Sequence, residues 1–243
     1  AVMSKRIFFF FFKGTPLFFI IIDNMRLDQW QTIAGDLRQV MRTVDEELYL
    51  SILPTTTQYS RNALFAGLMP AAIEELMPEY WIDEHEDEGK NLNEEKLLAK
   101  NLLRAGINCR WSYHKISSDA EGRSVNDRIT QLMGNDLNVL VYNFVDMLSH
   151  ARTEINIIRA LTADEASWLT QTHSWFIHSP LMELLRFVSS RSARVVFTTD
   201  HGSVRVQRPL KVVGDRQTSM NLRYKTGRNL DYNPREVFEI TAP

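Results

Sequence analysis

The stretch "LFFIIID", residues 17–23, joins an unbroken apolar run, Leu17–Ile22, to an aspartate, Asp23. A continuous apolar run of this length indicates a strand that is buried on both faces, as the central strands of a parallel sheet are. Two more runs of this kind, Leu137–Val145 and the apolar part of "RVVFTTDHG" (194–202), also lead into an aspartate. We therefore expect three buried strands that each deliver a carboxylate at the carboxyl end.

Segments with helical periodicity lie between these strands. Apolar residues recur at three- and four-residue spacing, which is typical of amphipathic helices. The expected helices are Arg26–Met41, Ser60–Leu68 ending near Gly67, Glu94–Arg104 ending at Gly106, Val125–Met133, and 163–190 with a break at Pro180. Further strands are expected at Leu48–Leu53 and Ile107–Tyr113. Strands separated by helices indicate an α/β fold with a mostly parallel central sheet and helices on both faces.

Composition limits the possible classes of protein. The chain has 243 residues, of which 44% are hydrophobic, and it contains no repeat or low-complexity linker, so we expect a single domain over residues 1–243. The net charge of −2 gives no global attraction to nucleic acid or anionic membranes. The single cysteine, Cys109, excludes an internal disulfide and fits a reducing cytoplasm.

Three further segments are the apolar N-terminus, an acidic stretch and a polar tail. The apolar runs Ile7–Phe12 and Leu17–Ile22 are each shorter than the roughly 18 residues of a membrane helix, so no membrane insertion is expected. An acidic, solvated loop is expected at "WIDEHEDEG" (81–89). The polar, glycine-containing tail at 213–233 is expected to form loops and short strands at one edge of the fold.

Asp23, Asp146 and Asp200 follow the three buried strands, at the edge of the sheet where ligands bind in open α/β folds. A charge there is costly unless it is paired or bound to a cation. Asp146 is four residues before His150, and Asp200 is next to His201. Carboxylate oxygens and imidazole nitrogens suit zinc or manganese. Taken singly, Asp23 could cap a helix, Asp146 could form a surface pair with His150, and Asp200 could belong to a turn. The occurrence of all three aspartates at the same edge of one sheet favours a metal site instead.

With these residues the chain resembles the PglZ domain of the alkaline phosphatase superfamily. The longer matching phrases are similar to the effector domain of PorX-type response regulators, which are tied to the type IX secretion system. The phrases that carry the resemblance are "FFIIIDNMRLDQW", "SILPTTTQYSRNALFAGLMP", "EGKNLNEE", "NFVDMLSHARTE", "TTDHG" and "VGDRQTSMNLRYKTGRNLDYNP".

The resemblance implies a bimetallic centre, usually zinc, in an alkaline-phosphatase-like fold. One metal would be held by Asp23, a nucleophilic threonine, Asp200 and His201, and the other by Asp146 and His150. The superfamily adds a third histidine from the far C-terminal part, and no histidine follows His201 here. We therefore expect a second site that is incomplete, or a fragment of a longer response regulator that lacks the receiver domain and the distal C-terminus.

Three threonines in "PTTTQY" compete for the role of nucleophile. A Pro-Thr-x-Thr element in the nucleotide pyrophosphatase/phosphodiesterase branch, counted from Pro54, selects Thr57. In an extended segment Thr55 would share the face of Thr57 and is the alternative, whereas Thr56 would point the other way. A helix beginning near Ser60 would add N–H donors and its positive dipole end toward a phosphate.

Four polar residues are expected to contact the substrate. Asn62 and Arg61 follow the threonines, with a position on the helix surface as the alternative for Arg61. Arg223 and Lys225 belong to a basic patch that matches a polyanion. Solvated loop charge is the alternative for that patch.

The resemblance implies a zinc-dependent phosphodiesterase, manganese being the other metal considered. It would cleave cyclic or linear oligonucleotides and serve as the output domain of a cytoplasmic two-component regulator. The expected partners are this substrate, other signalling or secretion-system proteins, and a second copy in a homodimer. The alternative is a regulatory module that senses metal or nucleotide with little turnover.

Overall fold

The computed structural model describes residues 14–82, 91–204, 206, 208–219 and 221–240. Its parallel sheet has the order β2-β3-β1-β4. The strands are β1 (Leu17–Ile22), β2 (Trp111–Ile116), β3 (Leu137–Tyr142) and β4 (Arg194–Thr198). Every residue of β1 and β3 is buried, as the apolar runs predict for central strands.

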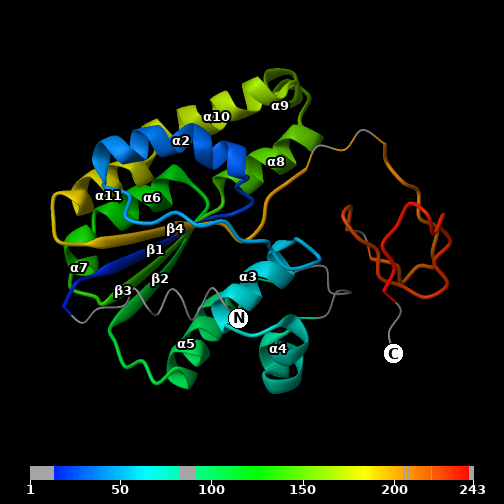
Figure 1. Ribbon diagram of the computed structural model, residues 1–243, viewed down its shortest axis with the longest axis horizontal. Helices are drawn as coiled ribbons and strands as arrows, with labels where there is room; N and C mark the ends of the chain where they lie inside the picture. Colours follow the sequence, from blue (N-terminus) through cyan, green and yellow to red (C-terminus); the bar gives the residue numbers. More distant parts are fainter. Residues whose placement is uncertain (1–13, 83–90, 205, 207, 220, 241–243) are drawn as a thin grey trace.

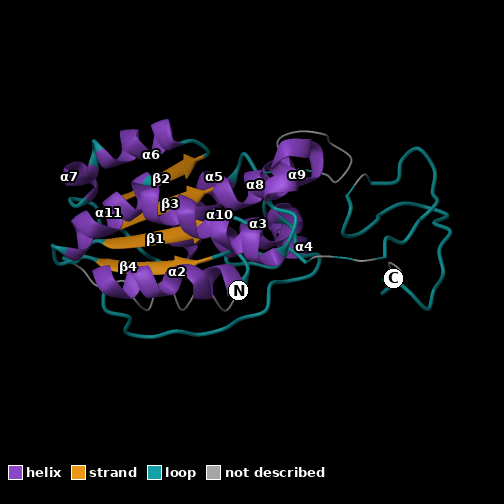
Figure 2. Cartoon of the chain, turned by 90° about the horizontal axis from the view of Figure 1, so that it is seen from above, coloured by secondary structure: helices purple, strands orange, loops and turns teal. Residues whose placement is uncertain are grey.

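Helices cover both faces of the sheet (Figures 1 and 2). Alternate side chains of β1 enter different cores, because neighbouring residues of a strand point to opposite faces. Phe18, Ile20 and Ile22 belong to one core and Leu17, Phe19 and Ile21 to the other.

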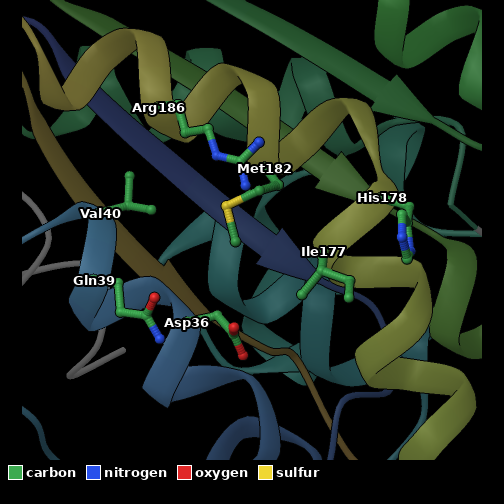
Figure 3. Close-up of a pocket in the computed structure, with 7 residues that line it drawn as sticks. All are labelled: Asp36, Gln39, Val40, Ile177, His178, Met182 and Arg186. Atoms are coloured by element: carbon green, nitrogen blue, oxygen red, sulfur yellow. The ribbon is translucent and has the colours of Figure 1, made fainter.

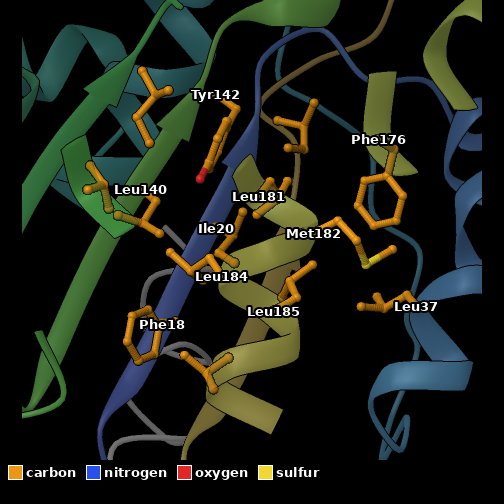
Figure 4. Packing of buried hydrophobic residues seen from close by; sticks show 14 of the residues in the cluster. Phe18, Ile20, Leu37, Leu140, Tyr142, Phe176, Leu181, Met182, Leu184 and Leu185 are labelled. Carbon is orange, nitrogen blue, oxygen red and sulfur yellow. The ribbon is translucent and has the colours of Figure 1, made fainter. Parts of the chain in front are cut away.

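The first core is packed by α2 (Leu27–Val40), α6 (Asp119–Asn126), α7 (Ile129–Leu132), α10 (Glu165–His178) and α11 (Pro180–Ser189). Figure 4 shows α11 against β1 in this core, with Leu181, Leu184 and Leu185 facing Ile20. The second core is packed by α3 (Thr57–Ala66), α4 (Pro70–Leu76) and α5 (Glu94–Arg104). The remaining helices are α8 (Phe144–Glu154), α9 (Asn156–Leu161) and the short 3₁₀ helix η1 (Pro78–Tyr80).

Most expected elements are confirmed, with shifts at their ends. α2 and α5 lie where the periodicity predicts them, and Pro180 is the first residue of α11. α3 begins at Thr57 rather than at Ser60. The segment expected to be one helix at Val125–Met133 forms the end of α6 and all of α7.

Three strand predictions need correction. β3 ends at Tyr142, and the expected last residues of that strand instead begin α8, which places Asp146 in the first turn of a helix. β4 ends at Thr198, two positions before Asp200. β2 begins at Trp111 rather than Ile107, because Trp111 is the residue that pairs with Leu137, the first residue of β3.

The strand expected at Leu48–Leu53 is wrong. This segment is neither strand nor helix, and Leu48, Leu50 and Leu53 are 74%, 96% and 72% exposed. Side chains hold it instead: the Tyr49 hydroxyl donates to the Thr199 carbonyl, and the Ser51 hydroxyl to the Asp200 carbonyl at 2.8 Å.

The two surface segments differ in what the structure describes of them. Most of the acidic stretch 81–89 lies outside the described residues. In the described part of the tail at 213–233, the one β-pairing is an antiparallel bridge between Val213 and Asp231, so the tail is mainly loop. In the described part of the chain, no helix has the length and apolarity needed to cross a membrane.

Candidate active site

Two strands, β1 and β4, and the helix α3 bring a cluster of potential metal ligands together beyond the carboxyl ends of the strands. Asp23 follows β1, Asp200 and His201 follow β4, and all three are buried. One ligand atom from each lies within 4.8 Å of the others. Figure 1 shows α3 beside this end of the sheet, and Thr57 is its first residue.

The hydroxyl of Thr57 faces the cluster. Its Oγ1 lies 3.0 Å from Nε2 of His201 and 3.4 Å from Oδ1 of Asp23. The other imidazole nitrogen, Nδ1, lies 3.3 Å from the carbonyl oxygen of Gly202. A carbonyl can only accept, so Nδ1 carries the hydrogen and Nε2 presents its lone pair toward Thr57.

Asp200 has one oxygen that is well bonded and one that is not. Oδ1 accepts from the backbone N–H of His201 at 2.9 Å and of Asn24 at 3.2 Å. Oδ2 is buried without a hydrogen-bond partner among the described residues, and it lies 3.8 Å from Nε2 of His201. A buried carboxylate oxygen left in this state is costly. Nη1 of Arg61 also faces Oδ2, but its distance of 3.8 Å is too long for a hydrogen bond, so the donor set around this oxygen fits a bound cation.

The pKa shifts of the clustered residues also fit a bound cation. Burial raises the pKa of Asp23 to about 6, and the neighbouring carboxylate of Asp200 adds to the shift. Burial also raises the pKa of Asp200 and lowers that of His201. Two buried carboxylates side by side oppose each other's ionisation, and a cation between them would reverse this effect.

Asp146 lies beside this cluster, and His150 at its rim. Oδ1 of Asp146 accepts from the side-chain amide of Asn24 at 3.1 Å, and Oδ2 lies 3.5 Å from Nε2 of His150. Burial and the charge of Asp23 raise the pKa of Asp146. The His150 side chain is 68% exposed. The structure thus pairs Asp146 with His150 and joins Asp146 to the first cluster through Asn24.

Asn24 is a site residue that the sequence reasoning missed. Its φ of 61° lies in the left-handed region, which asparagine tolerates better than most residues. In this conformation its backbone N–H reaches Asp200 while its side chain reaches Asp146. Asn24 therefore links the carboxylate of Asp200, in the loop after β4, to that of Asp146, in the first turn of α8. The signal available in the sequence was an asparagine directly after a strand-end aspartate.

The three threonines have different surroundings. Thr55 accepts from Nη1 of Arg223 through Oγ1, at 3.0 Å, and through its carbonyl. Thr56 is the N-cap residue of α3, yet its side chain makes no capping bond, and its hydroxyl is buried without a hydrogen-bond partner among the described residues. Among the three hydroxyls, the one that contacts Asp23 and His201 is that of Thr57.

The four residues expected to contact the substrate differ in where they lie relative to the cluster around Asp23. Arg223 reaches the mouth of the cluster, where Nη2 donates to Oδ1 of Asn24 at 3.5 Å. Asn62 is buried on α3. Lys225 donates to the carbonyl of Ser219 at 2.9 Å and so remains within the tail. Arg61 is buried behind Asp23 rather than exposed to a substrate.

A separate groove is lined by residues from α2, α10 and α11. Figure 3 shows Asp36 on one side and Met182 and Arg186 on the other. None of the strand-end aspartates or Thr57 lines it. The groove therefore does not belong to the cluster around Asp23.

Comparison with protein families agrees with the fold. A family model described as the BREX system PglZ alkaline phosphatase-like domain matches residues 3–243. A search of curated proteins found no match to the chain. The match covers nearly the whole chain and accounts for the parallel sheet with helices on both faces. The chain belongs to the PglZ family of alkaline phosphatase-like domains and is thus a phosphoesterase-type hydrolase.

Proposed function

We propose that this chain is a metal-dependent phosphodiesterase in which Thr57 is the nucleophile. The observation that carries the proposal is the position of the Thr57 hydroxyl, at the start of a helix and 3.0 Å from Nε2 of His201. The helix adds its positive dipole end and the N–H groups of its first turn on the side where a phosphate would lie. A hydroxyl in this position can attack a phosphate that is already held by the same helix end.

We propose two divalent cations, the second at an incomplete site, with zinc as the metal and manganese as the other candidate. Asp23, Thr57, Asp200 and His201 would hold the first ion, while Asp146 and His150 would hold the second. Bound there, a divalent cation supplies positive charge that favours loss of the hydroxyl proton and offsets charge on the phosphate oxygens.

The residues of the chain then act in two steps. The Thr57 oxygen forms a bond to phosphorus as the bond to the leaving oxygen breaks, which yields an ester of phosphothreonine. Water next attacks the same phosphorus, and the bond to Thr57 breaks to restore the hydroxyl. Arg223 and the first turn of α3 hold the non-bridging oxygens in both steps, since guanidinium and backbone N–H groups are strong donors to phosphate.

We propose cyclic or linear oligonucleotides as substrates. Arg223 supports a polyanionic substrate, because it is exposed and its guanidinium already lies over Thr55 and Asn24. The role as output domain of a two-component regulator rests on the sequence resemblance alone.

The experiment is a hydrolysis assay on metal-stripped protein to which zinc or manganese is added back. Bis(p-nitrophenyl) phosphate, p-nitrophenyl phosphate and short linear and cyclic oligonucleotides serve as substrates. We expect Thr57→Ala to lower kcat by at least about a thousandfold. Thr56→Ala, one residue away, is the matched control and should retain activity. An active Thr57→Ala variant would overturn the proposal, and tight metal binding without any hydrolysis would favour the sensing module.

A further inference from the structure

We propose that Arg61 and Glu94 act as a positioning pair that restricts Asp23 to binding a metal through Oδ1 alone. This inference rests on the proposed metal site. It concerns two residues that do not ligate the ion themselves, and it gives Arg61 a different role from the substrate contact expected from the sequence.

Arg61 lies behind Asp23 and away from solvent. Its side chain is 1% exposed, and Nη1 lies 2.7 Å from Oδ2 of Asp23. The same Nη1 lies 3.8 Å from Oδ2 of Asp200, so one guanidinium faces both carboxylates. Since Arg61 is one turn after Thr57 on α3, both side chains lie on the face of the helix that meets the cluster.

Glu94 fixes the direction of that guanidinium. Nε of Arg61 donates to Oε1 of Glu94 at 2.7 Å, and the Glu94 side chain is 0% exposed. The second oxygen, Oε2, accepts from the Tyr113 hydroxyl and lies 3.7 Å from Nζ of Lys115. Both carboxylate oxygens of Glu94 are therefore engaged, and Glu94 holds the planar guanidinium through Nε while Nη1 faces Asp23.

The contact with Arg61 makes the two carboxylate oxygens of Asp23 unequal. Oδ2 faces Arg61, whereas Oδ1 lies 3.4 Å from the Thr57 hydroxyl and 3.6 Å from Nε2 of His201. A bidentate carboxylate would have to withdraw Oδ2 from a buried guanidinium and leave that charge poorly paired. Asp23 is thus prepared to offer one oxygen, on the side where the other ligands lie.

This restriction bears on which metals the site accepts. Zinc prefers four ligands, and a one-oxygen carboxylate suits it. Calcium takes six to eight oxygen ligands and commonly uses both oxygens of a carboxylate. By holding Oδ2, the pair Arg61–Glu94 favours zinc over calcium at Asp23.

The test measures metal binding in the full chain without turnover. Dissociation constants for zinc and calcium are obtained by competition with a chelating dye for wild type, Arg61→Lys and Glu94→Gln, after circular dichroism shows that each is folded. Arg104→Lys is the matched control, because Arg104 donates to the Ala66 carbonyl and Asn101 and contacts no ligand-type residue of the cluster. We expect zinc affinity to fall about 10- to 100-fold in both variants, with a smaller preference over calcium, and to stay near wild type in the control.

Two further readouts separate this proposal from others. With bis(p-nitrophenyl) phosphate, we expect a lower kcat at saturating zinc with little change in KM, and a larger loss in Glu94→Gln than in Glu94→Asp. If Arg61→Lys and Glu94→Gln do not fold, Tyr113→Phe replaces them, since it removes only the hydroxyl that holds Glu94, and its zinc affinity should fall. Unchanged zinc affinity and zinc-to-calcium preference in the folded variants would overturn the positioning role. Wild-type protein that binds zinc but hydrolyses nothing would overturn only the proposed function.

Discussion

Oγ1 of Thr57 and Nε2 of His201 lie 3.0 Å apart, although 144 positions separate the two residues in the chain. One begins α3, and the other follows β4. The parallel sheet explains the meeting, because the carboxyl ends of its strands converge at one edge and α3 begins at that edge. The contact places the Thr57 hydroxyl against an imidazole nitrogen, next to the buried carboxylates of Asp23 and Asp200.

Arg223 and Lys225 should differ sharply in their effect on catalysis. Arg223→Ala removes a guanidinium that lies over Thr55 and Asn24, whereas Lys225→Ala removes an ammonium held by the Ser219 carbonyl. A charge-assisted hydrogen bond contributes about 1.5–3 kcal/mol, so kcat/KM should fall about 10- to 100-fold in Arg223→Ala. Lys225→Ala should stay close to wild type. Equal losses in the two variants, measured on bis(p-nitrophenyl) phosphate, would contradict this distinction.

Asp200→Asn should separate metal binding from stability. In the metal-free protein the substitution removes one of two adjacent buried carboxylates, so unfolding in urea should show a variant at least as stable as wild type. Zinc at about 100 times its dissociation constant should stabilise wild type by about 2.7 kcal/mol and the variant far less. A variant that is much less stable without metal, or equally stabilised by zinc, would mean that Asp200 is a structural residue.

The stability of the metal-free protein should depend on pH through Asp23. Its pKa is raised from 3.8 to about 6, mainly by burial. Between these pH values the folded state binds more protons than the unfolded state, so stability falls as pH rises. Two pKa units correspond to a loss on the order of 3 kcal/mol. Urea unfolding at pH 4, 5, 6 and 7 should give a shallower decline in Asp23→Asn, and identical slopes would show that Asp23 titrates normally.

Two glycines should respond to alanine in opposite directions. Gly67 ends α3 with a φ of 63°, a conformation that costs an alanine about 1 kcal/mol or more. Gly35 is exposed within α2, and a Cβ there would meet no atom within 4 Å. Gly35→Ala should therefore stabilise the protein by about 0.5–1 kcal/mol. Changes of the same sign in the two variants, measured by urea unfolding, would argue against the assigned end of α3.

Much of the fold could be predicted because its signals are local. The six apolar residues of β1 are buried on both faces, and this pattern was readable without knowing any partner strand. Leu48–Leu53 has a similar composition, but a strand exists only when another strand pairs with it. Here the hydroxyls of Tyr49 and Ser51 bond to the loop after β4 instead, and nothing in the sequence indicated those contacts.

The site was partly predictable for the same reason. Asp23, Asp200, His201 and Thr57 follow from strand ends and a recognisable threonine element, and the structure brings them together. Arg61 was expected at the substrate, although its spacing of one turn from Thr57 is compatible with the buried position that it has. Glu94 is 33 residues from Arg61, and its burial depends on how α5 packs against α3. Such long-range contacts have no signature in one sequence.

The most direct test of Thr57 as nucleophile is the stereochemical course at phosphorus. A phosphorothioate diester of defined configuration is hydrolysed in isotopically labelled water, and the configuration of the product is determined by nuclear magnetic resonance. Attack by Thr57 followed by attack by water inverts phosphorus twice, so we predict net retention. Net inversion would show that water attacks the diester directly and would contradict the role proposed for Thr57.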